Sequence, residues 1–205
     1  MRLNDYKIWI FDLDGTLYRQ APLRAEMALR LSAYYFLRPW RLSELLLIRE
    51  YRAAREKFFL PDEENFGRLD RKYKLPSEKI INDWMIDRAL PAVRRWRRKK
   101  ILSAIEEHRR AGGPAIVYSD YPVEKKLRSM GLTVDHEFWS GDPLIDCLKP
   151  EARGLNNIIE RLNLLRAEIL YVGDRDDRDG ECARRAGVMY LDVKEFERRL
   201  DDAAR

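Results

Sequence analysis

Short apolar runs recur along the chain at positions that predict strands. Residues 7–12, 114–119, 168–173 and 188–192 each contain consecutive apolar side chains and end in Asp, Ser or Gly. Runs this short and this uniformly apolar are typical of strands that are buried on both faces of a sheet. Residues 136–140 form a weaker candidate of the same kind.

Between these runs, the apolar residues follow the period of a helix. One segment has apolar side chains at i, i+3, i+4 and i+7, namely Leu155, Ile158, Ile159 and Leu162, which is typical of an amphipathic helix. Residues 101–111 and 177–186 predict two further helices, and each is followed by glycine, a common signal for a helix end. Strands that alternate with helices predict an α/β fold with a doubly wound, parallel, Rossmann-like sheet.

The interval between the first two predicted strands is too long for one crossover connection. About a hundred residues separate them, whereas crossovers in compact domains are much shorter. Helical periodicity continues through the interval. We therefore predict a core formed by residues 1–18 and 96–205, with residues 19–95 inserted as a helical subdomain after the first strand.

Composition limits the class of protein more than it limits the function. Apolar residues make up 45% of the chain, enough for a hydrophobic core, and the net charge of +5 favours anionic ligands. Neither of the two cysteines belongs to a CxxC pair, which favours a reducing compartment. No apolar stretch is long enough to cross a bilayer, so we expect a cytoplasmic protein without a membrane partner.

The strongest chemical signal follows the first predicted strand. Four apolar residues lead into Asp12-Leu13-Asp14-Gly15-Thr16. Side chains two residues apart on an extended chain point to the same side, so Asp12 and Asp14 can converge at the carboxyl end of a strand. Ligands bind at that edge of doubly wound sheets. Gly15 permits a tight turn and a close approach of the backbone to a phosphate.

Paired carboxylates at this place suit covalent phosphoryl transfer. One can attack phosphorus, and the other can protonate the leaving oxygen and later deprotonate a water molecule. A divalent cation would offset their mutual repulsion. A strand that simply ends in a turn also uses Asp and Gly, but the agreement of Asp12, Asp14, Gly15 and Thr16 together makes this alternative weak.

This segment resembles the first motif of the haloacid dehalogenase superfamily, a large group that consists mostly of phosphatases. The resemblance implies three further motifs in order along the chain. Ser119 at the end of a strand matches the second, whose hydroxyl binds the phosphoryl group. Lys149 before Pro150 matches the third, whose ammonium neutralises the aspartate and the phosphate. Asp174 after an apolar strand matches the fourth.

The resemblance also implies a Mg²⁺ site and a supporting acid. The ligands would be Asp12, Asp14 through its backbone carbonyl, and Asp174. The supporting acid is either Asp177 or Asp179, and the motif leaves both open. Two positions depart from the family pattern, because Asp120 and Arg178 stand where asparagine is common.

These observations predict a Mg²⁺-dependent phosphatase that acts on a small phosphorylated metabolite through an aspartyl-phosphate intermediate on Asp12, with Asp14 as acid and base. Inserted segments of this kind resemble the helical cap that selects substrate in one branch of the superfamily. A phosphomutase acting on a sugar phosphate is one alternative. A non-catalytic module whose basic cap binds nucleic acid or a protein partner is another, although we do not expect nucleic acid as a partner. The sequence does not indicate the oligomeric state.

Two segments invite other interpretations. The basic run 94–100 could bind RNA or acidic lipid, but we interpret it as a solvated helix face. The aromatic run 34–40 could lie at a membrane interface. We interpret it instead as part of the core of the helical subdomain, with arginines that extend to solvent.

Overall fold

The computed structural model describes residues 2–58 and 62–203. Its contacts divide the chain into two compact units, one formed by Met1–Gln20 and Trp96–Arg205 and the other by Ala21–Arg95. The second unit begins two residues later than the predicted insertion of residues 19–95. We describe each unit by itself.

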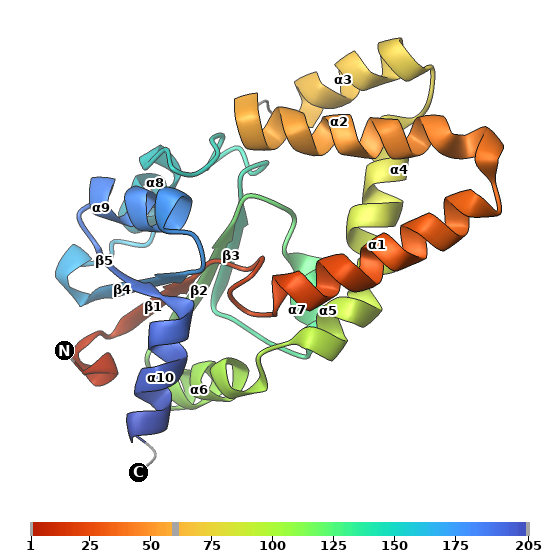
Figure 1. Ribbon diagram of the computed structural model, residues 1–205. Helices are drawn as coiled ribbons and strands as arrows, with labels where there is room; N and C mark the ends of the chain where they lie inside the picture. Colours follow the sequence, from red (N-terminus) through yellow and green to blue (C-terminus); the bar gives the residue numbers. More distant parts are fainter. Residues whose placement is uncertain (1, 59–61, 204–205) are drawn as a thin grey trace. The chain divides into compact units, whose positions relative to one another are not determined.

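The first unit is built on a five-stranded parallel sheet with the strand order β3-β2-β1-β4-β5 (Figure 1). Its strands are β1 (Ile8–Phe11), β2 (Ala115–Ser119), β3 (His136–Trp139), β4 (Ile169–Gly173) and β5 (Met189–Asp192). β1 lies at the centre and pairs with β2 on one side and β4 on the other. The predicted α/β fold and its parallel sheet are therefore confirmed.

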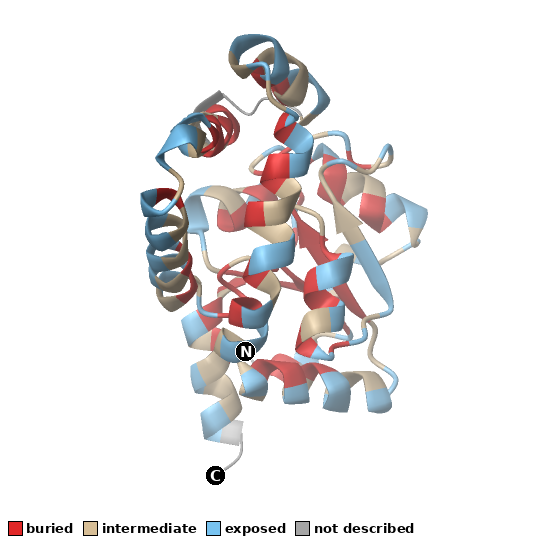
Figure 2. Cartoon of the chain, turned by 90° about the vertical axis from the view of Figure 1, so that its right-hand side faces the viewer, coloured by how far each residue is buried: buried red, intermediate tan, exposed pale blue. Residues whose placement is uncertain are grey.

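Alternate residues of β1 face opposite layers of helices, as the period of a strand requires. Ile8 and Ile10 belong to a cluster with apolar residues of α8 (Arg153–Arg161) and α9 (Glu181–Arg185). On the other face, the rings of Trp9 and Phe11 pack edge-on against Phe196 of α10 (Val193–Ala203), with centroids 5.3 and 5.5 Å apart. Figure 2 shows the central strands as buried, whereas the helices carry exposed residues along part of their surface.

Two more helices complete this unit, α6 (Lys99–Arg110) and α7 (Glu124–Met130). The predicted helix at 177–186 is divided. Asp176–Gly180 forms a wide turn with the hydrogen bonding of a π-helix, and α9 follows it directly. Turns of this type are frequent at functional sites, and this one begins two residues after Asp174.

The chain leaves and re-enters the first unit through two paired segments. The backbone amide of Arg19 donates to the carbonyl of Trp96, and the amide of Arg98 donates to the carbonyl of Leu17, each over 2.9 Å. An antiparallel bridge between Tyr18 and Arg97 lies between these two bonds. The ends of the insertion are thus joined by a short ladder of hydrogen bonds.

The second unit is helical. It contains α1 (Gln20–Phe36), α2 (Leu42–Phe58), α3 (Asp62–Tyr73), α4 (Ser77–Ile81) and α5 (Leu90–Trp96), with short turns such as η2 (Pro39–Arg41) between some of them. Trp84 is buried and packs against Tyr34 and Tyr35, with ring centroids 5.0 and 5.7 Å away. The hydroxyl of Tyr35 donates to Glu44 over 3.2 Å.

The interpretation of residues 34–40 as subdomain core is wrong for most of the apolar side chains in that run. Tyr35 is buried, but Phe36, Leu37 and Trp40 are 85%, 67% and 75% exposed. The reason is helical phase. Leu23, Met27 and Tyr35 are the buried residues of α1, and Phe36, the next residue after Tyr35, points about 100° away from it.

The basic run 94–100 is not a single solvated helix face. It passes from the end of α5 to the start of α6. Arg98 forms an ion pair with Glu197 of α10 at 2.6 Å, and Lys100 forms one with Asp201. These two cations are partly neutralised within the first unit.

The contacts of Phe196 allow a test of this core. We expect Phe196→Ala to lower the free energy of unfolding by about 3–5 kcal/mol, because it removes a fully buried ring. Leu165→Ala is the matched control. Leu165 is 63% exposed, so its truncation should change the stability by less than about 0.5 kcal/mol. Urea unfolding of both variants measures this, and equal effects would contradict the packing described.

Candidate active site

The candidate site lies at the carboxyl edge of the sheet, where the strand order changes direction. β2 and β3 extend from one side of β1, and β4 and β5 extend from the other. In doubly wound sheets this switch point forms a crevice that binds ligands. Asp12 follows β1, Ser119 ends β2 and Asp174 follows β4, so the topology brings three predicted site residues to this edge.

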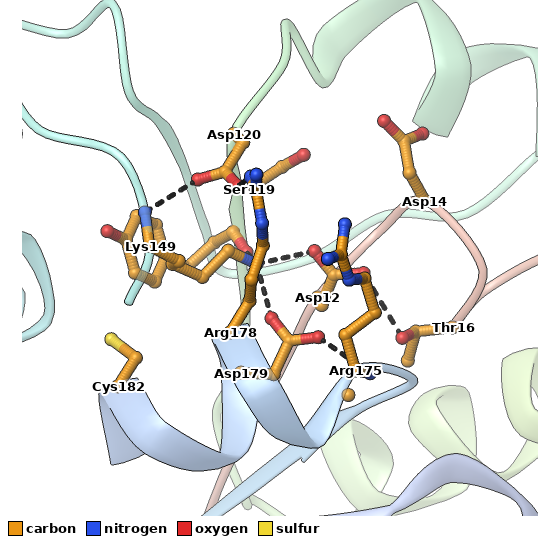
Figure 3. A network of polar contacts seen from close by, with 12 residues as sticks. Asp12, Asp14, Thr16, Ser119, Asp120, Lys149, Arg175, Arg178, Asp179 and Cys182 are labelled. Atoms are coloured by element: carbon orange, nitrogen blue, oxygen red, sulfur yellow. Dashed lines mark hydrogen bonds and ion pairs between the residues drawn. The ribbon is translucent and has the colours of Figure 1, made fainter. Parts of the chain in front are cut away.

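A buried lysine lies at the centre of the site (Figure 3). Lys149 is 2% exposed, and its Nζ lies 2.6 Å from Oδ1 of Asp12 and 2.6 Å from Oδ1 of Asp179. It also donates to the Tyr171 hydroxyl over 3.3 Å. An ammonium removed from water needs such partners, because burial without them costs several kcal/mol.

The charges in this cluster alter one another's proton affinity. Burial raises the pKa of Asp12, Lys149 opposes this, and the neighbouring carboxylates reinforce it, so that the net pKa lies well above its usual value. Burial alone would lower the pKa of Lys149, but Asp12 and Asp179 outweigh it and raise the pKa. Lys149 therefore stays protonated and holds a positive charge beside Asp12.

Asp12 is held by three contacts, with Lys149, Thr16 and Val172. Its Oδ2 accepts a hydrogen bond from Thr16 Oγ1 over 3.1 Å, while Oδ1 is held by Lys149. Its backbone amide donates to Val172 of β4 over 2.9 Å, which continues the sheet pairing one residue past the strand. The carboxylate is thus held in one orientation at the strand end.

Asp174 approaches the first loop closely. Gly15 adopts a φ of +107°, and a Cβ at this position would lie 2.1 Å from Oδ2 of Asp174. Only glycine satisfies both the backbone conformation and the contact. Burial, followed by the charge of Asp179, raises the pKa of Asp174 to about 6.

Carboxylate oxygens from Asp12, Asp174 and Asp179 lie within 4.8 Å of one another. Hard oxygen ligands in such a group fit Mg²⁺. This group consists of side-chain oxygens only, so the predicted ligand role of the Asp14 backbone carbonyl stays a prediction. The group also contains Asp179, which the sequence predicts only as a candidate supporting acid.

The structure distinguishes Asp177 from Asp179, the two candidates for the supporting acid. Asp179 is 2% exposed, contacts Lys149, and accepts a hydrogen bond from the Arg175 amide over 3.2 Å. Asp177 is exposed and pairs with the Arg175 side chain at 2.7 Å. Only Asp179 therefore reaches the cluster.

Asp14 lies apart from the cluster, and Figure 3 shows its carboxylate turned away from Asp12. Lys126 of α7 contacts both of its oxygens, at 2.6 and 2.9 Å, and the Tyr18 hydroxyl donates to the same carboxylate. Lys126 is only 5% exposed. Sequence reasoning missed this lysine, because nothing in the sequence distinguishes it from its exposed neighbour Lys125.

Asp120 and Arg178, the two residues that depart from the family pattern, contact each other. Asp120 Oδ2 lies 3.3 Å from Arg178 Nη1, and Asp120 Oδ1 accepts a hydrogen bond from the backbone amide of Lys149 over 3.0 Å. Asp120 thereby connects the loop that carries Lys149 to the turn that carries Asp179. Ser119 is 1% exposed, and its Oγ accepts a hydrogen bond from the Tyr121 amide over 3.2 Å.

Comparisons with known proteins agree with this arrangement. The sequence profile of the haloacid dehalogenase-like hydrolases matches residues 6–187. No curated protein sequence matches the chain. Similar solved structures include the hydrolase YfnB from Bacillus subtilis bound to magnesium, with a TM-score of 0.58 and 18% identity, which covers 93% of this chain and 88% of that one.

Two other solved structures represent different chemistries. A 2-haloacid dehalogenase from Pseudomonas syringae pv. Tomato has a TM-score of 0.62 and 16% identity, covering 90% of this chain and 85% of that one. A phosphatase from Thermococcus onnurineus has a TM-score of 0.53 and 20% identity, covering 93% and 85%. At these identities the likeness shows the fold alone. The matched profile, which spans all four motifs, shows that the chain belongs to the haloacid dehalogenase-like hydrolases.

Proposed function

We propose that this enzyme is a Mg²⁺-dependent phosphate-monoester hydrolase that acts on a small phosphorylated metabolite through an aspartyl-phosphate on Asp12. The observation that carries the proposal is the buried Lys149, which is shared between Asp12 and Asp179 beside Asp174. This group combines a fixed nucleophile, a permanent positive charge and a set of oxygen ligands, which are the components that phosphoryl transfer needs.

In the proposed first step, Asp12 attacks phosphorus and forms an oxygen–phosphorus bond. The bond to the leaving oxygen breaks, and that oxygen keeps the electron pair and takes a proton from Asp14. Lys149 and the Ser119 hydroxyl would bind the phosphoryl oxygens. Mg²⁺ held by Asp12, Asp174 and Asp179 would supply charge neutralisation on these oxygens.

In the second step, a water molecule attacks phosphorus and gives a proton to Asp14. Inorganic phosphate leaves, and the Asp12 carboxylate is restored. Asp14 is turned away from Asp12 and held by Lys126 and Tyr18. A change of its side-chain rotamer therefore precedes proton transfer in this scheme.

The presence of Asp14 supports phosphate esters over haloacids as substrates. A halide leaves as a stable anion and needs no proton, whereas an alkoxide leaving group does. The resemblance implies that dehalogenases of this superfamily lack an acid at this position. Phosphomutase activity uses the same first step, so the products distinguish it from hydrolysis.

The first experiment measures release of inorganic phosphate from a panel of phosphorylated metabolites. We expect activity with Mg²⁺, none with EDTA, and a loss of at least about a thousandfold in Asp12→Asn, which removes the nucleophile but preserves the shape. Asp177→Asn is the matched control, because this exposed acid lies outside the cluster. An isomerised phosphosugar without free phosphate would instead indicate a mutase, and full activity in Asp12→Asn would refute the mechanism.

A double-mutant cycle tests the role of Lys126. We expect Lys126→Met to lower kcat about tenfold, because Lys126 keeps the Asp14 carboxylate at the edge of the cluster, one rotamer change away from the leaving oxygen, and without it the carboxylate samples many orientations. Asp14→Asn should lower kcat further, and the double variant should be no slower than Asp14→Asn alone. Losses that multiply in the double variant would show that Lys126 acts independently of Asp14.

The raised pKa of Asp174 predicts how metal binding depends on pH. Without metal, this carboxyl is protonated below about pH 6, and Mg²⁺ must then displace the proton. We expect the apparent Mg²⁺ affinity to fall by at least about tenfold per pH unit below about pH 6, where Asp174 takes up a proton in addition to Asp12, whose pKa is also raised. Calorimetric titration at about pH 5, 6 and 7.5 measures this. Equal affinities at the extremes would exclude Asp174 as a ligand.

A further inference from the structure

Exposed apolar side chains concentrate on one part of the second unit. In the described ranges, eight large hydrophobic residues are exposed, and six of them lie between positions 29 and 46: Leu29, Phe36, Leu37, Trp40, Leu42 and Leu46. We call these six residues the exposed apolar patch. Clusters of this kind are uncommon on soluble proteins and mark sites of interaction.

The patch surrounds the turn that joins α1 to α2. Leu29 and Phe36 are seven residues apart, so they lie on one face of α1 about 10 Å apart along the axis. The side chains exposed between them on this face are small, Ser32 and Ala33. On α2, Leu42 and Leu46 share a face with Arg49. Leu37 and Trp40 both lie in the connection between the two helices.

Most charged residues of the segment that carries the patch are positive. Residues 21–49 contain five arginines and two glutamates. Both glutamates are neutralised inside the unit, since Glu26 pairs with Arg30 at 2.6 Å and Glu44, which is 6% exposed, pairs with Arg41 at 2.6 Å. The patch therefore presents apolar and aromatic side chains with an excess of guanidinium groups.

Some of these arginines are not engaged in ion pairs. Within the described residues, Arg24, Arg38 and Arg49 have no acidic partner. Arg24 and Arg49 are exposed, and Arg38 lies over the ring of Tyr34 at 4.4 Å from its centroid. Their charges are available to an external anionic surface.

We propose that the exposed apolar patch docks onto an anionic lipid surface. Trp40 and Phe36 would enter the interfacial layer, and the arginines would contact the headgroups, an arrangement that combines apolar burial with charge attraction. The charges favour this partner over a second copy of the chain. A symmetric dimer would place the arginines of one patch against those of the other, with no acid to offset them.

The proposed contact is peripheral. In the described part of the chain, no helix combines the length and apolar content needed to cross a bilayer. Docking would place the enzyme at a surface without insertion of a helix across it. The inference does not depend on the proposed phosphatase activity, because it uses residues that take no part in the chemistry.

Co-sedimentation of the full chain with vesicles tests the proposal. We expect binding to vesicles of phosphatidylcholine and phosphatidylserine, much weaker binding to phosphatidylcholine alone, and weakening by salt as the charges are screened. Phe36→Ser/Trp40→Ser should bind at least about tenfold more weakly. Leu165→Ser, which removes a 63% exposed leucine from the first unit, and Asp12→Asn should bind like the wild type.

Quenching of tryptophan fluorescence by brominated lipids adds a site-specific measurement. Trp40→Phe keeps an aromatic side chain, so it should still bind but lose part of the quenching. Failure of the folded wild type to bind phosphatidylserine vesicles at low salt would overturn the proposal. So would a dimer, detected by light scattering, that dissociates in Phe36→Ser/Trp40→Ser, because the patch would then bind a second copy.

Discussion

The site depends on one buried ammonium shared between two carboxylates. Lys149, Asp12 and Asp179 come from three distant segments of the chain, and each would be costly to bury alone. When both acids are ionised, the three groups carry one positive and two negative charges, and the remaining negative charge lies beside Asp174. The same interaction that makes burial tolerable thus leaves a local excess of negative charge, which a divalent cation can neutralise.

This constraint explains several features around the cluster. The wide turn at Asp176–Gly180 aims Asp179 inward while Asp177 stays in solvent. Asp120 holds the amide of Lys149 and also contacts Arg178 from that turn. A carboxylate at position 120 is accompanied by a guanidinium at position 178, so the two departures from the family pattern offset each other in charge.

Much of the fold could be predicted from sequence, because strand and helix periods are local properties. All five strands lie within a residue or two of the predicted runs. The first motif correctly places Asp12 at the strand end, but the convergence of Asp12 and Asp14 that its spacing predicts is not observed, because Lys126 and Tyr18 hold Asp14. Lys126 could not be found in this way, since its burial depends on how α7 packs and not on its neighbours in sequence. The choice between Asp177 and Asp179 likewise depended on a turn whose hydrogen bonding no local pattern specifies.

The same limit applied to the second unit. The apolar residues of a helical segment predict core, but periodicity gives only their relative phase, and Phe36 and Trp40 lie on the outer side. A sequence pattern can show that residues share a face. It cannot show whether that face meets protein, lipid or water.

The backbone hydrogen bonds between Leu17 and Arg98 and between Arg19 and Trp96 affect which insertions such a chain can accept. Because these hydrogen bonds join the two ends of the insertion, the core can form them whatever sequence lies between the ends. The entropy of closing a loop grows only slowly with its length. The second unit is therefore exchangeable in principle: a different insert, or a short turn, could join the same two ends while the catalytic edge of the sheet keeps its geometry.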